Sequence, residues 1–319
     1  MTHEQPCVVV LGGSGFVGGH LRAAFRSSGA RVVSVSRTRP DGVAGNGPAA
    51  ERFVAFDLLA TSPAELAAML AGTGADVVVN AAGGYWKMTD QQMWRANTEL
   101  VSTLVAAVRE LPHRPLLIQL GSVHEYGPGS RDTGFTEERT PAPVNAYGRS
   151  KLEAAHRVLE AAGASELNGV VLRIANIIGP GLPAGSLLGD IAAHLERFAQ
   201  DGEAADRELV LGPLNAERDF IDVRDVADAV LAVTRAPRAD ITGRVINIGS
   251  GEAVSAARVA KRLIELSALP VRLVERARTG PSRGDVDCQM LDISRARQLL
   301  GWMPRRDLDA SLTGLLTAA

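Results

Sequence analysis

Cysteine, net charge and long apolar runs are all scarce in this sequence, and each absence excludes a class of protein. Only two of the 319 residues are cysteines, so we expect neither a disulfide framework nor a metal site. The net charge of −2 does not favour binding to nucleic acid. No apolar stretch approaches the roughly 18 residues of a membrane span. The amino-terminal MTHEQP lacks the basic start and apolar core of a signal peptide, so the expected compartment is the cytoplasm.

The sequence does contain an alternation of short apolar runs and longer helical patterns. The runs are rich in valine, isoleucine and leucine, which is typical of parallel strands buried on both faces. Helical patterns separate them, including one that begins at the capping residue Ser62 and another that covers 88–111. This order predicts an α/β fold with a Rossmann-type doubly wound parallel sheet. The predicted strands are 7–11, 31–36, 52–56, 76–80, 115–120 and 169–174.

The alternation becomes less regular after Asn176, which predicts a second, smaller domain at the C-terminal end. Two later segments, 208–213 and 244–251, have the pattern of isolated strands between helices. The two tryptophans Trp94 and Trp302 are expected to pack against other side chains. The predicted domains are 1–176 with about 220–250 for the Rossmann domain, and about 177–219 with 251–319 for the smaller domain.

Residues 12–18, GGSGFVG, form a glycine-rich turn after the first strand. Gly12, Gly15 and Gly18 have the spacing that permits a tight turn, a close approach of the backbone to a pyrophosphate and close helix–strand packing. The amino terminus of the following helix would then face the anion. The turn therefore predicts a dinucleotide-binding site.

The end of the second strand indicates which dinucleotide binds. NAD-binding sites usually carry an acidic residue there for the ribose hydroxyl. This sequence has Ser36 and Arg37 instead, with Arg39 close by. Serine does not repel a ribose phosphate and arginine can pair with it, so we favour NADP(H), with NAD(H) as the second choice. The alternative is a solvated arginine pair on a loop.

With this turn, the spacing Tyr147-x-x-x-Lys151 and Ser122, which lies 25 residues before Tyr147, the chain resembles the extended short-chain dehydrogenase/reductase family. That family includes nucleotide-sugar epimerases, 4,6-dehydratases and 4-ketoreductases. The resemblance implies that Ser122, Tyr147 and Lys151 are catalytic. It implies cofactor contacts at Gly12, Gly15, Phe16, Val17, Gly18, Ser36, Arg37, Asp57, Leu58, Asn80, Ala81, Ala82, Gly83, Asn97, Tyr147 and Lys151.

The second half of the chain supports the same resemblance. The segments LRIANIIGPG, ERDFIDVRDVADA and SRGDV match the family's patterns for holding a nucleotide-diphosphate sugar in the smaller, substrate-binding domain. Arginine suits this role because its planar fork fits phosphate oxygens and keeps its charge. The expected substrate contacts are Tyr85, Val123, His124, Asn176, Arg218 and Arg283, the two arginines being assigned to the diphosphate. Tyr85 follows the nicotinamide segment and either lines the sugar pocket or packs in the core or at an interface.

A tyrosine at this site would act as a proton donor. A free phenol has a pKa of about 10, and a nearby ammonium favours its ionised form. In a reductase, hydride attacks a carbonyl carbon, Tyr147 protonates the developing alkoxide, and the Ser122 hydroxyl holds the same oxygen. The resemblance also implies that Lys151 holds the nicotinamide ribose. The alternative is a surface tyrosine and lysine on an ordinary helix.

The residues after Ser122 discriminate between the reactions of the family. Dehydratases carry an Asp-Glu pair there, whereas this chain has Val123 and His124, so dehydration is disfavoured. Glu125 comes one residue late and is expected to be a structural or substrate contact. His124 is either a second acid or a substrate contact. Epimerases typically use NAD, which Arg37 disfavours.

The segments GSVHEYG and FTEERTPAPVNAYGRSK resemble most those of 4-ketoreductases acting on nucleotide-linked 4-keto-6-deoxyhexoses. We therefore expect NADPH-dependent reduction of a keto group, at C4, in deoxysugar biosynthesis. The alternatives are an NAD-dependent nucleotide-sugar 4-epimerase, an enzyme acting on a ketone that carries no nucleotide, and a non-enzymatic dinucleotide-binding regulator. A homodimer joined through helices near 88–111 and 146–162 is also expected.

Overall fold

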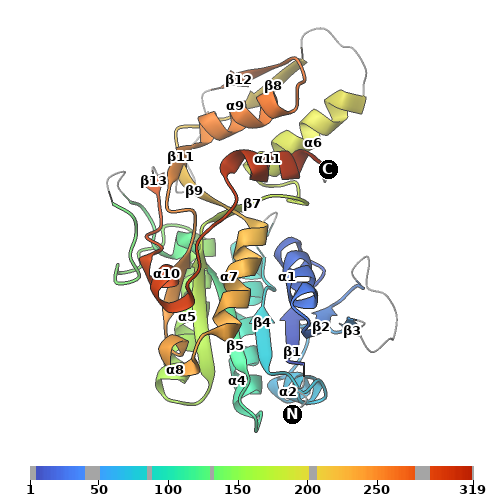
Figure 1. Cartoon of the computed structure of the whole chain (residues 1–319), viewed down its shortest axis with the longest axis vertical. Helices are drawn as coiled ribbons and strands as arrows, with labels where there is room; N and C mark the ends of the chain where they lie inside the picture. The colour runs from blue at the N-terminus through green and yellow to red at the C-terminus, as the bar shows by residue number, and fades with distance from the viewer. Residues whose placement is uncertain are drawn as a thin grey trace.

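Seven parallel strands form the central sheet (Figure 1), in the order β10-β6-β5-β4-β1-β2-β3. The computed structural model describes residues 5–39, 51–84, 88–129, 133–200, 207–276 and 288–317. The sheet, with its helices on both faces, confirms the predicted Rossmann-type doubly wound fold. Its strands are β1 (Cys7–Leu11), β2 (Arg31–Ser36), β3 (Arg52–Ala55), β4 (Val77–Asn80), β5 (Leu116–Ser122), β6 (Asn168–Ile174) and β10 (Val245–Ile248).

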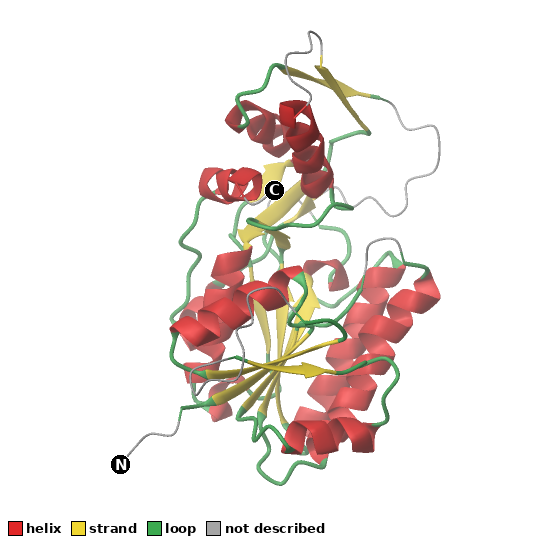
Figure 2. Cartoon of the chain, turned by 90° about the vertical axis from the view of Figure 1, so that its right-hand side faces the viewer, coloured by secondary structure: helices red, strands yellow, loops and turns green. Residues whose placement is uncertain are grey.

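Successive side chains of these strands enter two different cores. Val8 and Val10 of β1 pack with one set of helices, and Val9 and Leu11 pack with the other, because neighbouring residues of a strand point to opposite faces. Figure 2 shows the sheet edge-on between helical layers. The first core is covered by α1 (Phe16–Ser27), α7 (Val223–Arg235), α8 (Arg238–Ile241) and α10 (Ser294–Leu300), and the second by α2 (Pro63–Ala71), α4 (Leu100–Arg109) and α5 (Ala146–Gly163).

The helix expected at 88–111 forms in three parts. The short helix α3 (Asp90–Trp94) leads into the π-helical turn η1 (Arg95–Glu99), which continues as α4. Trp94 is 43% exposed, so the prediction that it packs is wrong for the single chain. The neighbouring Met93 takes the inward position on this helix. Trp302 is buried, as predicted.

The part of the chain after Asn176 builds a third core and two small sheets. The segment 208–213 is not the isolated strand that its pattern predicts, because β8 (Arg207–Leu211) pairs in parallel with β12 (Val271–Glu275), a strand distant in sequence. The segment 244–251 is not isolated either, because β10 extends the central sheet beside β6. The elements are β7 (Asn176–Ile178), α6 (Leu187–Gln200), β8 (Arg207–Leu211), β9 (Glu217–Asp222), β11 (Ala253–Ser255), α9 (Ala256–Leu266), β12 (Val271–Glu275), β13 (Cys288–Gln289) and α11 (Leu308–Thr317).

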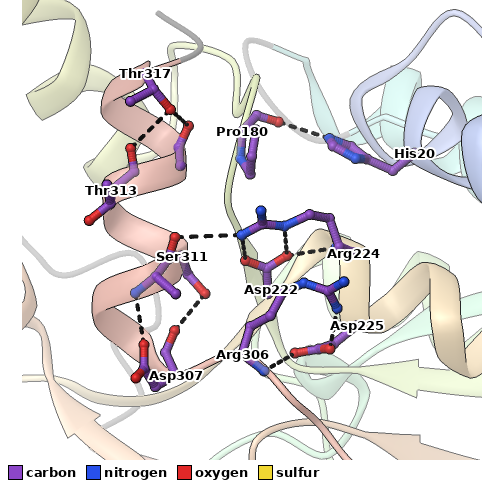
Figure 3. Close-up of polar contacts among 12 residues, drawn as sticks. His20, Pro180, Asp222, Arg224, Asp225, Arg306, Asp307, Ser311, Thr313 and Thr317 are labelled. Carbon is purple, nitrogen blue, oxygen red and sulfur yellow. Dashed lines mark hydrogen bonds and ion pairs between the residues drawn. The ribbon is translucent and has the colours of Figure 1, made fainter.

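Polar contacts tie the third core to the central sheet (Figure 3). Asp222 ends β9, caps α7 and pairs with Arg224 at 2.7 Å. Arg306, just before α11, pairs with Asp225 at 2.5 Å and so fixes that segment along α7. His20 of α1 contacts the carbonyl oxygen of Pro180 at 2.9 Å. The contacts of Arg306 and His20 thus connect the smaller part to α7 and α1, which cover the sheet.

Across the ranges described, no helix combines the length and the apolarity that a membrane crossing needs. The domain boundaries stay a prediction.

Candidate functional site

The glycine turn lies where β1 ends, and its glycines are required by close backbone contacts. Gly12 has φ +78°, and a Cβ there would lie 2.7 Å from the backbone nitrogen of Ala82. A Cβ at Gly18 would lie 2.2 Å from the carbonyl oxygen of Gly12. The turn therefore packs against both the end of β4 and the start of α1, as a dinucleotide cradle does.

The amino terminus of α1 opens directly from this turn. Gly15 is its cap and provides no side-chain hydrogen bond, so the first backbone N–H groups of the helix remain available for an anion. Phe16 and Val17 form the first turn, and the ring of Phe16 packs edge-on against His20, with 5.7 Å between centroids. These residues fit a bound pyrophosphate.

The carboxyl ends of β2 and β3 supply the residues expected near the adenosine. The Ser36 hydroxyl is buried and donates to the carbonyl oxygen of Thr38 at 2.7 Å, while Arg37 is exposed. Asp57 is exposed and accepts the N–H of Leu59 at 3.0 Å. Leu58 is 9% exposed and packs in the core. Of this group, Arg37 and Asp57 present charge to solvent.

Asn80, Ala81, Ala82 and Gly83 follow one another at the carboxyl end of β4. The buried Asn80 donates to Oε1 of Gln119 at 2.8 Å, and its own Oδ1 accepts the Ala82 N–H at 3.2 Å. Ala81 and Ala82 are half-buried, and Gly83 is exposed. This loop therefore lies beside the glycine turn at the carboxyl edge of the sheet, and its last residue, Gly83, is exposed to solvent.

Asn97 fixes the continuation of that loop. It lies in the π-helical turn η1, accepts the Gly84 N–H at 3.0 Å, and donates to the Gly84 carbonyl oxygen at 2.9 Å and to Oγ of Ser150 at 3.0 Å. A Cβ at Gly83 would lie 2.7 Å from Oδ1 of Asn97 and 4.0 Å from Nζ of Lys151. Asn97 thus joins the β4 loop to α5, and its side chain is occupied by protein contacts.

Lys151 lies on α5 with its ammonium buried against the end of β5. Its Nζ donates to the carbonyl oxygen of Leu120 at 2.6 Å. Burial lowers the pKa of Lys151 to about 8, and the negative charge of Glu125 opposes that fall. Lys151 is therefore a cation near neutral pH that loses its proton far more readily than an exposed lysine.

Ser122 and Tyr147 approach the same place from β5 and α5. Ser122 ends β5, and its Oγ accepts the His124 N–H at 3.3 Å. The Tyr147 ring packs edge-on against the His124 ring, with centroids 5.6 Å apart and planes at 73°. A Cβ at Gly148 would lie 2.4 Å from the His124 carbonyl oxygen, so glycine permits this approach of α5. The structure thus brings Ser122, Tyr147 and Lys151 to one edge of the sheet.

His124 is neutral at physiological pH. Burial, together with the smaller effect of the positive charge of Arg218, lowers its pKa to about 4. His124 can therefore donate or accept a hydrogen bond at this site, but it does not supply a positive charge.

The residues expected to hold the substrate come from several elements. Asn176 donates from Nδ2 to the Asp219 carbonyl oxygen at 3.0 Å. Arg218 donates from Nη1 to the Glu217 carbonyl oxygen at 2.9 Å. Val123 is 1% exposed, and its side chain packs in the core and is not open to a ligand. Tyr85 and Arg283 lie outside the described residues.

The sequence did not reveal the partner of Glu125. Glu125 belongs to the 3₁₀ turn η2 (Val123–Glu125) and pairs with Arg173 of β6, both residues being buried. One signal was available: Arg173 interrupts the apolar run GVVLRI, and a charge in a buried strand needs a partner. The pairing shows that Glu125 faces the protein interior, so of its two expected roles the structural one is confirmed.

Comparison with known proteins agrees with this geometry. The model of the NAD dependent epimerase/dehydratase family matches residues 8–249. The chain is 42% identical over 317 residues to a dTDP-6-deoxy-L-talose 4-dehydrogenase (NAD(P)(+)) of Kitasatospora kifunensis, covering 99% of this chain and 96% of the relative. It is 27% identical over 346 residues to a UDP-glucose 4-epimerase of Azospirillum brasilense, covering 100% of this chain and 92% of the relative.

The fold also matches a solved structure along nearly its whole length. MoeE5 in complex with UDP-glucuronic acid and NAD superposes with a TM-score of 0.82, at 25% identity, covering 97% of each chain.

Proposed function

The chain belongs to the NAD dependent epimerase/dehydratase family, and from this premise we propose that it reduces the C4 keto group of a nucleotide-diphosphate 4-keto-6-deoxyhexose with NADPH. That it is an NAD(P)-dependent enzyme follows from the family and the relatives. The observation that carries the finer proposal is the full-length similarity to a 4-dehydrogenase of a dTDP-linked 6-deoxyhexose. A dehydrogenase and a ketoreductase at the same carbon use the same groups in opposite directions.

The proposed chemistry assigns one step to each of three side chains. NADPH, when bound, would supply the hydride that reduces the carbonyl carbon. Tyr147 gives its phenolic proton to the carbonyl oxygen as the new C–H bond forms, and Ser122 donates a hydrogen bond to the same oxygen. The ammonium of Lys151 favours the phenolate that Tyr147 becomes, because opposite charges stabilise each other in a site shielded from water.

The proposed cofactor contacts run along the carboxyl edge of the sheet. The glycine turn and the start of α1 would hold the pyrophosphate, and the loop from Asn80 to Gly83 would line the nicotinamide half. Exposed Arg37 would pair with the ribose phosphate, which is why NADP(H) is preferred to NAD(H). On the substrate side, Arg218 and Arg283 would hold the diphosphate, and Asn176, His124 and Tyr85 would contact the sugar nucleotide.

An NAD-dependent nucleotide-sugar 4-epimerase is the second candidate, and the full-length similarity to a UDP-glucose 4-epimerase favours it. The two functions differ in cofactor consumption. A reductase oxidises one NADPH for each product formed, whereas an epimerase returns the hydride to the same carbon and consumes none.

The test is an assay of NADPH and NADH oxidation over a panel of dTDP-, UDP- and GDP-linked 4-keto-6-deoxyhexoses, with each product identified by NMR. We expect stoichiometric NADPH oxidation and a 6-deoxyhexose with a new C4 hydroxyl. Interconversion of C4 epimers without net oxidation of either cofactor would replace the reductase with the epimerase. No turnover of any nucleotide-linked ketone would overturn the proposal.

We also propose a homodimer joined through α4 and α5. Exposed Trp94, on the helix preceding η1 and α4, is a large apolar side chain that a partner subunit could cover. Light scattering coupled to gel filtration would measure the mass, and a monomer at micromolar concentration would contradict the dimer. The cytoplasmic location stays a prediction.

A further inference from the structure

Glu125 is a buried carboxylate directly behind the proposed catalytic groups, and its role there rests on the function proposed above. Its exposed fraction is 0%, although it belongs to a short turn at the end of β5. A buried carboxylate is unfavourable unless it is paired and hydrogen-bonded, so its contacts indicate what it does.

Each oxygen of this carboxylate has a different partner. Oε1 accepts the backbone N–H of Ser122 at 2.8 Å, and Oε2 accepts Nε–H of Arg173 at 2.6 Å. The Arg173 guanidinium in turn lies over the ring of Tyr126, 4.4 Å from its centroid. Arg173 of β6 therefore fixes the carboxylate of Glu125, and Glu125 in turn fixes the backbone of Ser122, the last residue of β5.

The backbone beside Glu125 leaves room for the carboxylate. A Cβ at Gly121 would lie 2.5 Å from Oε1 of Glu125, so no other residue type fits at position 121 without displacing the carboxylate. Gly121 and Ser122 are the last two residues of β5. The strand end that presents the Ser122 hydroxyl is thus shaped around this side chain.

Glu125 and Lys151 hold the same strand end, because Nζ of Lys151 donates to the Leu120 carbonyl oxygen at 2.6 Å and Glu125 accepts the N–H of Ser122, two residues further along β5. The elements packed against α5 are α3, α4, β5, β6, η1 and η2. Among their described residues, the charged groups of the buried interior are Glu125 and its partner Arg173, with the neutral His124 beside Tyr147. The remaining charged residues on these elements face solvent, namely Asp90, Arg95, Glu99 and Arg109.

We propose that Glu125 is a positioning residue for the reaction, which holds the backbone of Ser122 and places a negative charge at the strand end that Lys151 contacts. Both contributions act through other residues, because Glu125 is enclosed and has no access to a ligand. Burial alone lowers the pKa of Lys151, and the charge of Glu125 offsets part of that effect. Ser122 and Lys151 thus depend on the same carboxylate.

The test exploits the scarcity of lysine in this chain, which has only Lys87, Lys151 and Lys261. With 13Cε-labelled lysine, NMR follows the titration of each ammonium directly, and K87R and K261R assign the signals. We compare E125Q, which keeps the size and an acceptor for the Ser122 N–H but removes the charge. The pKa of Lys151 is expected to fall by roughly one pH unit. An unchanged Lys151 titration in folded E125Q would overturn the electrostatic role.

Two further variants separate the two contributions. E153Q removes a carboxylate of α5 that pairs with Arg157 at 2.6 Å, and it should leave the Lys151 titration unchanged. E125D keeps the charge, but its shorter side chain no longer reaches the Ser122 N–H from the same place. In E125D we expect kcat to fall about tenfold at little change in KM, with Lys151 titrating near its wild-type value. An unchanged kcat in E125D would overturn the positioning of Ser122, whether or not E125Q folds.

The titration does not depend on turnover. Failure of the substrate panel would therefore remove the proposed reduction without altering the Lys151 result, and an unchanged Lys151 titration would leave the reduction standing.

Discussion

The ammonium nitrogen of Lys151 donates a hydrogen bond of 2.6 Å to the carbonyl oxygen of Leu120. This contact joins α5 to β5 two residues before Ser122. It lies at the carboxyl edge of the sheet, where the glycine turn also lies. Tyr147 lies four residues before Lys151 on α5, and therefore one helical turn away on the same face. A single buried cation thus connects the proposed proton donor to the strand end that carries the serine.

The pH dependence of reduction should follow the titration of Lys151. The pKa of Lys151 is about 8, so the ammonium that stabilises the Tyr147 phenolate is present below pH 8 and is lost above it. We expect kcat for ketone reduction to decline roughly tenfold for each pH unit above that value. Stopped-flow measurement of hydride transfer from pH 6 to 10 checks this, and a rate that stays flat to pH 10 would contradict it.

Replacing Tyr147 with phenylalanine should strongly reduce turnover but not cofactor binding. Loss of the proton donor is expected to lower kcat by about 10²- to 10⁴-fold, with the dissociation constant for NADPH nearly unchanged. Tyr126→Phe is the matched control, because its hydroxyl donates to Oδ1 of Asn247 at 2.8 Å and serves the fold. Y126F should cost about 1–3 kcal/mol of stability and retain activity. Comparable turnover in Y147F and wild type would be incompatible with the mechanism.

His124 should make the folded state sensitive to mild acid. Its folded pKa of about 4 lies below the ordinary value of 6.5, so the unfolded chain binds more protons between these values. Stability is therefore lost as the pH falls from 6.5 to 4. For the fall from pH 7 to pH 5 we expect a loss of stability on the order of 1–3 kcal/mol. Urea unfolding at pH 7 and pH 5 should show a smaller difference for H124N than for wild type.

Neighbouring glycines of α1 should respond in opposite directions to alanine. In G18A the new Cβ would lie 2.2 Å from the Gly12 carbonyl oxygen, which should cost about 1–3 kcal/mol and weaken NADPH binding. In G19A the Cβ would enter open space on a helix, which should stabilise the chain by roughly 0.5–1 kcal/mol. Thermal melts and fluorescence titration with NADPH measure both effects. Equal behaviour of the two variants would refute the close contact.

Arg37 should determine the choice of cofactor. Removing its side chain in R37A is expected to raise KM for NADPH about tenfold or more, while KM for NADH changes little. Arg31, at the other end of β2, donates to the Thr73 carbonyl oxygen at 3.0 Å, so R31A provides a control away from the cofactor edge. Parallel changes in KM for NADPH and NADH in R37A would remove the basis for preferring NADP(H).

Local patterns in the sequence were sufficient to predict six of the seven strands of the central sheet and the positions of the glycine turn, Ser122, Tyr147 and Lys151. A short apolar run identifies a buried strand because side chains alternate between the two faces of a strand every second residue. A glycine turn is likewise recognised from a few neighbouring residues, because the steric requirement for glycine is local. The helical spacing of Tyr147 and Lys151 is set by α5 alone. These features therefore needed no knowledge of the rest of the chain.

Only the tertiary structure decided which distant groups meet. It pairs Glu125 with Arg173, 48 residues away, joins Asn97 to Ser150, brings β8 beside β12 and leaves Trp94 exposed. The physical reason is that the burial of a side chain, and the partner of a charged group, depend on how distant helices and strands pack together. The spacing of apolar residues within one helix or strand does not specify that packing. Sequence spacing thus placed Tyr147 and Lys151 on one helical face, whereas the fold enclosed Lys151 between β5 and the β4 loop and so moved its pKa.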